Sequence, residues 1–151
     1  MNKTQHPAEY LFSEGHPLTA SMKMKFIPVG ENALRVELSA PDSFADRDNT
    51  HTHSGFATLL LDTVLGSCAI GKLEKMQPIA TIKLTCNHLQ KIEVREPIYC
   101  LAEWKGEENS VSYVSGEIRR QSNDTVISTA IGTFMIGTAS RPLEEKTVNS
   151  K

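Results

Sequence analysis

The sequence is short of cysteine and has no excess of one charge, and each shortage excludes a class of protein. The 151-residue chain contains three cysteines, Cys68, Cys86 and Cys100, which lie far apart and form no CxxC pair. An odd, scattered set favours buried free thiols in a reducing compartment over a disulfide framework. The 16 basic and 18 acidic residues give a net charge of -2. That balance offers no electrostatic attraction for nucleic acid or an anionic membrane surface.

No segment of the sequence predicts export or membrane insertion. The first seven residues, Met-Asn-Lys-Thr-Gln-His-Pro, contain no apolar signal core. No apolar run is long enough to span a bilayer, so we expect a cytoplasmic protein. Because 39% of the residues are hydrophobic and the charges are scattered, residues 1–151 are expected to form one domain. Its core is predicted to run from about residue 18 to 138, with flexible termini.

One stretch, residues 56–71, is apolar or small on every side and carries a single charge, Asp62. A helix that is apolar all round must be buried on all sides, and a sheet wrapped around it can achieve this. A carboxylate there is costly unless it is hydrogen-bonded or its pKa shifts. Chemistry is one reason to keep such a group. We therefore interpret Asp62 as the reacting group and the glycine-containing turn before it as the other half of a site.

The ends of this helix also carry signals. Ser54 is a plausible N-cap after a polar loop from Pro41 to Thr52. Lys72 and Lys75 would then lie in the last turns, where positive charge suits the helix dipole. The pair Gln77-Pro78 is predicted to end the helix.

The rest of the chain has the two-residue periodicity of strands. In the segment that follows the helix, Ala80, Ile82, Leu84 and Cys86 are predicted to share one face. Short polar turns favour antiparallel neighbours, so we expect a hairpin and then a meander of consecutive strands. Residues 7–12 could form a helical turn. The predicted strands are 22–26, 34–38, 79–89, 97–105, 111–120 and 125–136.

Three segments in register resemble a known family. The sequence His53-Ser-Gly-Phe-Ala-Thr-Leu-Leu-Leu-Asp62 is similar to the His-Gly-Gly-(six residues)-Asp/Glu signature of the phenylacetic-acid-pathway type of hotdog acyl-CoA thioesterases. Residues 81–89, which open with a threonine, resemble the strand after the helix in that family. Residues 130–137 resemble its closing strand. The resemblance implies an α+β hotdog fold, in which one long buried helix is wrapped by a six-stranded antiparallel sheet.

The resemblance also implies roles for individual residues. Asp62 would be the general base or the nucleophile, and Thr81 would hydrogen-bond near it or near the attacking water. The backbone N–H of Ser54, in the turn with Gly55, would stabilise the oxyanion, and His53 would shape that turn. The family forms its site between two subunits, which implies a homodimer or a dimer of dimers. Thioester hydrolysis of an acyl-CoA would need no metal and no cofactor.

Two positions depart from the family pattern. Ser54 replaces the first glycine, which keeps a backbone donor unless the turn requires positive φ. Family members usually carry an asparagine six residues before the histidine, where this chain has Arg47. We take Asn49 as the tentative substitute for positioning water.

Other readings remain open at this point. His51 and His53 have a spacing that could bind metal from a strand, but no third ligand lies near in sequence. Arg119, Arg120 and Lys105 could contact coenzyme A phosphates, although paired charges at a strand end are more often only solvated. The chain could instead be a non-catalytic module that binds acyl-CoA. A dehydratase on the same fold would need a histidine facing an acid, which His53 and Asp62 do not provide by spacing.

Overall fold

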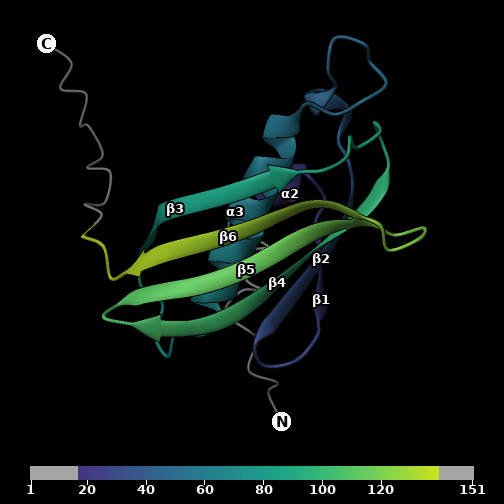
Figure 1. Cartoon of the computed structure of the whole chain (residues 1–151). Helices are drawn as coiled ribbons and strands as arrows, with labels where there is room; N and C mark the ends of the chain where they lie inside the picture. The colour runs from purple at the N-terminus through teal and green to yellow at the C-terminus, as the bar shows by residue number, and fades with distance from the viewer. Residues whose placement is uncertain (1–16, 140–151) are drawn as a thin grey trace, which may run out of the picture.

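The computed structural model describes residues 17–139, which form one antiparallel sheet with a long helix packed against it (Figure 1). The strand order is β1-β2-β4-β5-β6-β3. The elements are α2 (Pro17–Ser21), β1 (Lys25–Pro28), β2 (Ala33–Ser39), a 3₁₀ helix (Asp42–Phe44), α3 (Ser54–Ile70), β3 (Ile79–His88), β4 (Pro97–Glu108), β5 (Val111–Arg120) and β6 (Val126–Ile136). The expected order of one helix between the second and third of six strands is confirmed.

The predicted meander is correct for β4, β5 and β6 but wrong for β3. Strand β3 pairs with β6 at one edge of the sheet, and β4 pairs with β2. Tight turns specify which strands are neighbours only where the connection is short. Both connections of β3 are long, because α3 precedes it and residues 89–96 follow it. The chain is therefore free to place β3 at the far edge, as Figure 1 shows.

Helix α3 forms the centre of the core, but it is not buried on every side as predicted. Leu60, Leu61, Val64 and Leu65 are fully buried against the sheet. One stripe of the helix, made of Thr58, Leu59, Asp62 and Thr63, stays exposed or half-buried. Composition alone could not reveal this stripe, because Leu59 is as apolar as the residues that face the sheet.

Both predicted ends of α3 are wrong. The N-cap is His53, whose imidazole accepts a hydrogen bond from the Gly55 N–H. At the other end the helix stops at Ile70, well before Gln77-Pro78. Lys72 then turns its ammonium group to the carbonyl oxygen of Glu31 and to Asn32 Oδ1, at 3.0 and 2.7 Å. The lysine thus ties the chain after the helix to the β1–β2 turn instead of extending the helix.

A bulge in β3 breaks its predicted alternation. The register with β6 shifts between Thr81 and Lys83, so one extra residue inverts the alternation of side chains across that point. Ile82, predicted to share a face with Leu84 and Cys86, is 52% exposed, while Leu84 and Cys86 are half-buried. The prediction that Ala80, Ile82, Leu84 and Cys86 share one face is therefore wrong. The bulge matters for the site because it turns Thr81 toward α3.

The remaining differences are local. The first strand starts at Lys25 and not at Met22, and α2, which was not predicted, precedes it. The predicted strand 97–105 continues to Glu108 as β4, with a bulge between Trp104 and Gly106. The β4–β5 turn therefore lies at Asn109-Ser110, both with positive φ. The predicted helical turn at residues 7–12 and the tail beyond 139 lie outside the described residues. No helix among residues 17–139 is long and apolar enough to cross a bilayer.

Candidate active site

Asp62 and Thr81 meet at the open stripe of α3. The Thr81 hydroxyl donates a hydrogen bond of 2.8 Å to Asp62 Oδ1. Both residues line a hollow of about 240 Å³ whose apolar walls include Ile79 and Phe134. The hydroxyl fixes one carboxylate oxygen and leaves Oδ2 available to accept a proton. The carboxylate is half-buried, so it is less shielded from water than an all-round buried helix would make it.

The turn at the start of α3 is organised by His53. Its backbone N–H donates to the Phe44 carbonyl oxygen at 2.8 Å, and its own carbonyl oxygen accepts from the Phe56 N–H at 3.0 Å. Its Nδ1 accepts from the Gly55 N–H, also at 3.0 Å. Ser54 is the first helical residue, and its N–H has no acceptor within the helix. Ser54 is not among the residues with positive φ, so serine occupies this position without backbone strain.

A second hollow, of about 330 Å³, opens at this end of α3. Sequence reasoning missed several of its polar groups. His88, at the end of β3, lies 3.1 Å from Thr58 Oγ1 through Nε2 and 3.0 Å from Ser128 Oγ through Nδ1. The buried Thr52 Oγ1 has no hydrogen-bond partner among residues 17–139. The residues that line this hollow include Thr52, His53, Ser54, His88, Gln90, Lys91 and Ser128.

One signal in the sequence could have pointed to this hollow. Ser54, Thr58 and Asp62 follow each other at intervals of four, so they share one face of a helix. That spacing places Thr58 between the two expected halves of the site.

The structure does not bring Asn49 to either hollow. Asn49 has a φ of 53°, and its N–H donates to the Asp46 carbonyl oxygen at 2.9 Å. It lines a separate surface depression with Glu93 and Arg95. The tentative role of Asn49 in positioning water therefore has no support in this arrangement.

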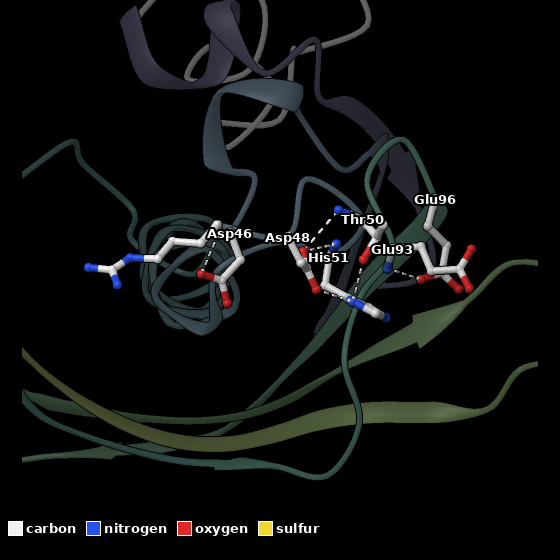
Figure 2. Close-up of polar contacts among 7 residues, drawn as sticks. Asp46, Asp48, Thr50, His51, Glu93 and Glu96 are labelled. Carbon is white, nitrogen blue, oxygen red and sulfur yellow. Dashed lines mark hydrogen bonds and ion pairs between the residues drawn. The ribbon is translucent and has the colours of Figure 1, made fainter.

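The loop before α3 is tied together by Asp48 (Figure 2). Its carboxylate accepts from the backbone N–H groups of Thr50 and His51 and contacts His51 Nδ1 at 2.9 Å. The hydrogen bond from His51 holds the pKa of Asp48 well below its usual value. His51 thus faces Asp48, whereas His53 caps the helix, so the two histidines of the HxH pair serve different partners. Among residues 17–139 no three metal-ligating side chains lie together.

The basic residues suggested for coenzyme A phosphates are all paired with carboxylates. Arg119 contacts Glu117 at 2.6 Å, Arg120 contacts Glu96 at 2.5 Å, and Lys105 contacts Glu103 at 2.6 Å. A cation already neutralised in this way attracts phosphate weakly. The three residues are therefore poor candidates for a phosphate site.

The two hollows are too far apart to act on one group within a single chain. Eight residues separate Ser54 from Asp62, which corresponds to about 12 Å along the helix axis. A thioester carbonyl group is much shorter than this distance, because a C=O bond measures about 1.2 Å. A carbonyl oxygen that touches the Ser54 N–H of one chain is thus out of reach of the Asp62 of the same chain.

Comparison with known proteins identifies the fold and the family. The family model of the thioesterase superfamily matches residues 49–127. This range contains α3 and β3, which line both hollows. No curated protein matches by sequence at a significant level.

Several solved structures share the fold. A phenylacetic acid degradation-related protein from Ralstonia eutropha JMP134 has a TM-score of 0.74 at 18% identity and covers 85% of this chain and 98% of its own. The PaaI protein of E. coli, from the phenylacetic acid degradation operon, has a TM-score of 0.75 at 13% identity, covering 87% and 94%. A Streptococcus mutans UA159 protein bound to acetyl-CoA has a TM-score of 0.67 at 14% identity, covering 79% and 91%.

Proposed function

This chain belongs to the thioesterase superfamily and has the hotdog fold, and from that premise we propose that it hydrolyses acyl-CoA thioesters with Asp62 as general base or nucleophile. The observation that carries the proposal is the 2.8 Å contact between Thr81 and Asp62 on the open stripe of α3. A carboxylate oriented by one hydroxyl keeps its second oxygen for a proton or for the carbonyl carbon. Positioned carboxylates of this kind contribute about 10²–10⁴ in rate as general bases.

The chemistry needs a donor for the negative charge that develops on the carbonyl oxygen. In the proposed mechanism, the Ser54 N–H at the positive end of α3 binds this oxygen. Asp62 removes a proton from water as the water oxygen bonds to the carbonyl carbon. The tetrahedral intermediate then collapses, the carbon–sulfur bond breaks, and the coenzyme A thiolate takes up a proton. Direct attack by Asp62 would give an anhydride that water opens to the same products.

The geometry favours a site shared between two copies of the chain. Strand β3 forms one edge of the sheet and exposes Ile82 beside it. If two β3 strands pair antiparallel about their midpoints, Ile79 of one strand lies opposite His88 of the other. The partner subunit's Asp62 and Thr81 then approach the hollow at the first chain's Ser54. We therefore propose a homodimer, which can pair further into a dimer of dimers, in the cytoplasm.

The first experiment measures thiol release from acetyl-, hexanoyl-, palmitoyl-, phenylacetyl- and benzoyl-CoA. We expect turnover by the native chain and a loss of about 10² or more in kcat for Asp62→Asn. Glu108→Gln, which removes one exposed carboxylate on the β4–β5 hairpin, is the matched control and should keep native turnover. Equal turnover by Asp62→Asn and the native chain would refute the role of Asp62. Thermal stabilisation by acyl-CoA without any turnover would indicate a binding module.

A mixing experiment tests whether the site is shared. Ser54→Pro removes the backbone N–H together with the serine hydroxyl, and the helix should persist because proline is well tolerated at the first helical position. His53, with φ of -58° and ψ of 137°, already has the extended backbone that a following proline requires. Co-refolding inactive Ser54→Pro with inactive Asp62→Asn should restore about a quarter of the native sites, since half of the dimers are mixed and each has one intact site. No recovery in verified mixed dimers would show that each chain works alone.

A further inference from the structure

We propose that the His88 Nε2–H is a second hydrogen-bond donor to the thioester oxygen, beside the Ser54 N–H. This inference rests on the proposed function and names one more catalytic residue for it. Three observations support it: the number of backbone N–H groups still free at the start of α3, the hydrogen bonds that fix the imidazole, and the position of His88 in the hollow.

The start of α3 offers a single backbone donor. The Gly55 N–H is bonded to His53 Nδ1 and the Phe56 N–H to the His53 carbonyl oxygen. Within the described part of the chain, only the Ser54 N–H of this turn stays available for a ligand. An oxyanion has lone pairs for more than one donor, and each well-placed donor accounts for about 10²–10³ in rate. A second donor has to be a side chain that lines the same hollow.

The other side chains around the hollow are held differently. His51 is bonded to Asp48 and Thr50. Gln90 and Lys91 lie in the loop after β3, where Arg120 binds two of their acceptors, the Gln90 Oε1 and the Lys91 carbonyl oxygen. His88 instead points at the open stripe of α3 through its contact with Thr58.

Ser128 sets the tautomer of His88. The two residues are directly opposite in the β3–β6 register, and Ser128 is fully buried. A buried hydroxyl needs an acceptor for its proton, and the one that the structure provides is His88 Nδ1 at 3.0 Å. With Nδ1 accepting, the neutral ring carries its proton on Nε2. Nε2–H is therefore a donor, and it currently faces Thr58 Oγ1 at 3.1 Å.

The position of Thr58 places this donor close to Ser54. Thr58 lies one turn beyond Ser54 on the same face of α3, a rise of about 6 Å. Two donors that each lie about 3 Å from one oxygen are at most about 6 Å apart. The Thr58 hydroxyl can rotate to the carbonyl oxygen four residues earlier in the helix, which frees Nε2–H for the substrate. The unpartnered Thr52 hydroxyl in the same hollow independently indicates that a polar ligand group binds there.

The test compares His88→Phe, which removes the donor but keeps an aromatic ring, with His88→Gln, which keeps an N–H donor. With an acyl-CoA that the native chain turns over, we expect His88→Phe to lose about 10² in kcat with KM changed little. His88→Gln should recover part of that loss. Asn87→Ala, a neighbour on the outer face of β3, is the control and should keep native kcat. Thermal unfolding verifies that each variant is folded.

A spectroscopic measurement on the native protein does not depend on any variant. Nitrogen-15 NMR of the labelled imidazoles should show His88 with its proton on Nε2 and a bare Nδ1 at neutral ring charge. A proton on Nδ1 would overturn the inference, because Nε2 would then be an acceptor.

The outcomes separate this inference from the proposed function. Native kcat in a folded His88→Phe chain, together with an inactive Asp62→Asn chain, would overturn the role of His88 and leave the thioesterase intact. A rise in KM without a fall in kcat would also overturn it, because a donor to the oxyanion acts in the transition state. A native chain that releases no thiol from any thioester would refute both proposals.

Discussion

Substituting Gly116 by alanine should loosen the packing that sets the position of α3. Gly116 lies on β5 between Ala102 of β4 and Ala130 of β6, so three small residues form a shallow depression in the sheet. Leu65 of α3 fills it. A Cβ added at Gly116 would lie 2.4 Å from Leu65 Cδ1 and 3.0 Å from the Leu101 carbonyl oxygen. Carbon atoms in good contact lie about 3.5–4.0 Å apart, so Leu65 would have to move by more than 1 Å.

The size of the effect follows from how little room Leu65 has. Its other methyl group, Cδ2, is near Gly132, where an added Cβ would lie 3.3 Å away. Overpacking of this kind costs about 1–3 kcal/mol, and the backbone oxygen on the far side favours the upper half of that range. Loss of glycine entropy in the unfolded chain offsets about 0.4–1 kcal/mol. We expect a net loss of roughly 1–2 kcal/mol in the free energy of unfolding, or a fall in Tm of roughly 2–8 °C.

Urea unfolding followed by circular dichroism measures this loss. The m value should stay constant, because the surface exposed on unfolding is nearly unchanged. Ser115→Ala, whose side chain is on the other face of β5, is the matched control. A double-mutant cycle with Leu65→Ala should show that the two changes compensate by at least about 1 kcal/mol, because the new methyl group fills part of the cavity left by Leu65. A Gly116→Ala chain as stable as the native one, or strict additivity in the cycle, would refute the packing argument.

Two further predictions concern buried polar groups. Thr52→Val removes a buried hydroxyl that has no partner among the described residues. The free energy of unfolding, measured by urea unfolding, should therefore rise by about 1 kcal/mol. A loss of stability would mean that the hydroxyl has a protein partner. If that hydroxyl binds substrate, KM should rise in the same variant. Burial raises the pKa of Cys68 to about 11 and raises that of Cys100 further above its usual value. At pH 8 both are thiols and not thiolates, so a thiol reagent should label them only after unfolding. Rapid labelling of Cys68 or Cys100 in the folded chain would contradict this, whereas labelling of the half-buried Cys86 would not.

The sequence contained enough to predict the architecture because each element has a local cause. The alternation in residues 111–120 alone gives the exact bounds of β5, and the apolar run from residue 56 gives the helix. The predictions that were wrong, the faces of β3 and its place in the sheet, depend on tertiary structure. The bulge at Ile82 depends on how β3 pairs with β6, and that pairing depends on where α3 leaves the sheet. Neither contact is encoded by nearby residues.

The same division applies to the site. Asp62 was predicted from its place as the single charge in an apolar helix and Thr81 from a resemblance, and the structure brings their side chains to 2.8 Å. The cap was misassigned because serine and asparagine are the usual N-caps, whereas here the imidazole of His53 accepts the hydrogen bond. The sequence does not single out His88, because its partners, Thr58 and Ser128, are 30 and 40 residues away in sequence. A contact across two elements leaves no periodic signal.

The open stripe of α3 supports the proposal that the site of a single chain is incomplete. A helix that sits on a sheet could bury every remaining side chain under loops or carry charges on its open face. This helix instead leaves Leu59 and Thr63 half-buried around one carboxylate, while its first turn keeps one free amide about 12 Å away. In the proposed mechanism, neither half is sufficient alone. A second copy that pairs along β3 would cover the stripe and join the two halves, so loss of the dimer should abolish activity even in a chain that stays folded. Ile82 and Leu89 are both exposed, on β3 and directly after it. The double variant Ile82→Lys, Leu89→Lys should therefore separate the subunits and stop turnover. Light scattering measures the first effect and the thiol-release assay the second. An active monomer would contradict the shared site.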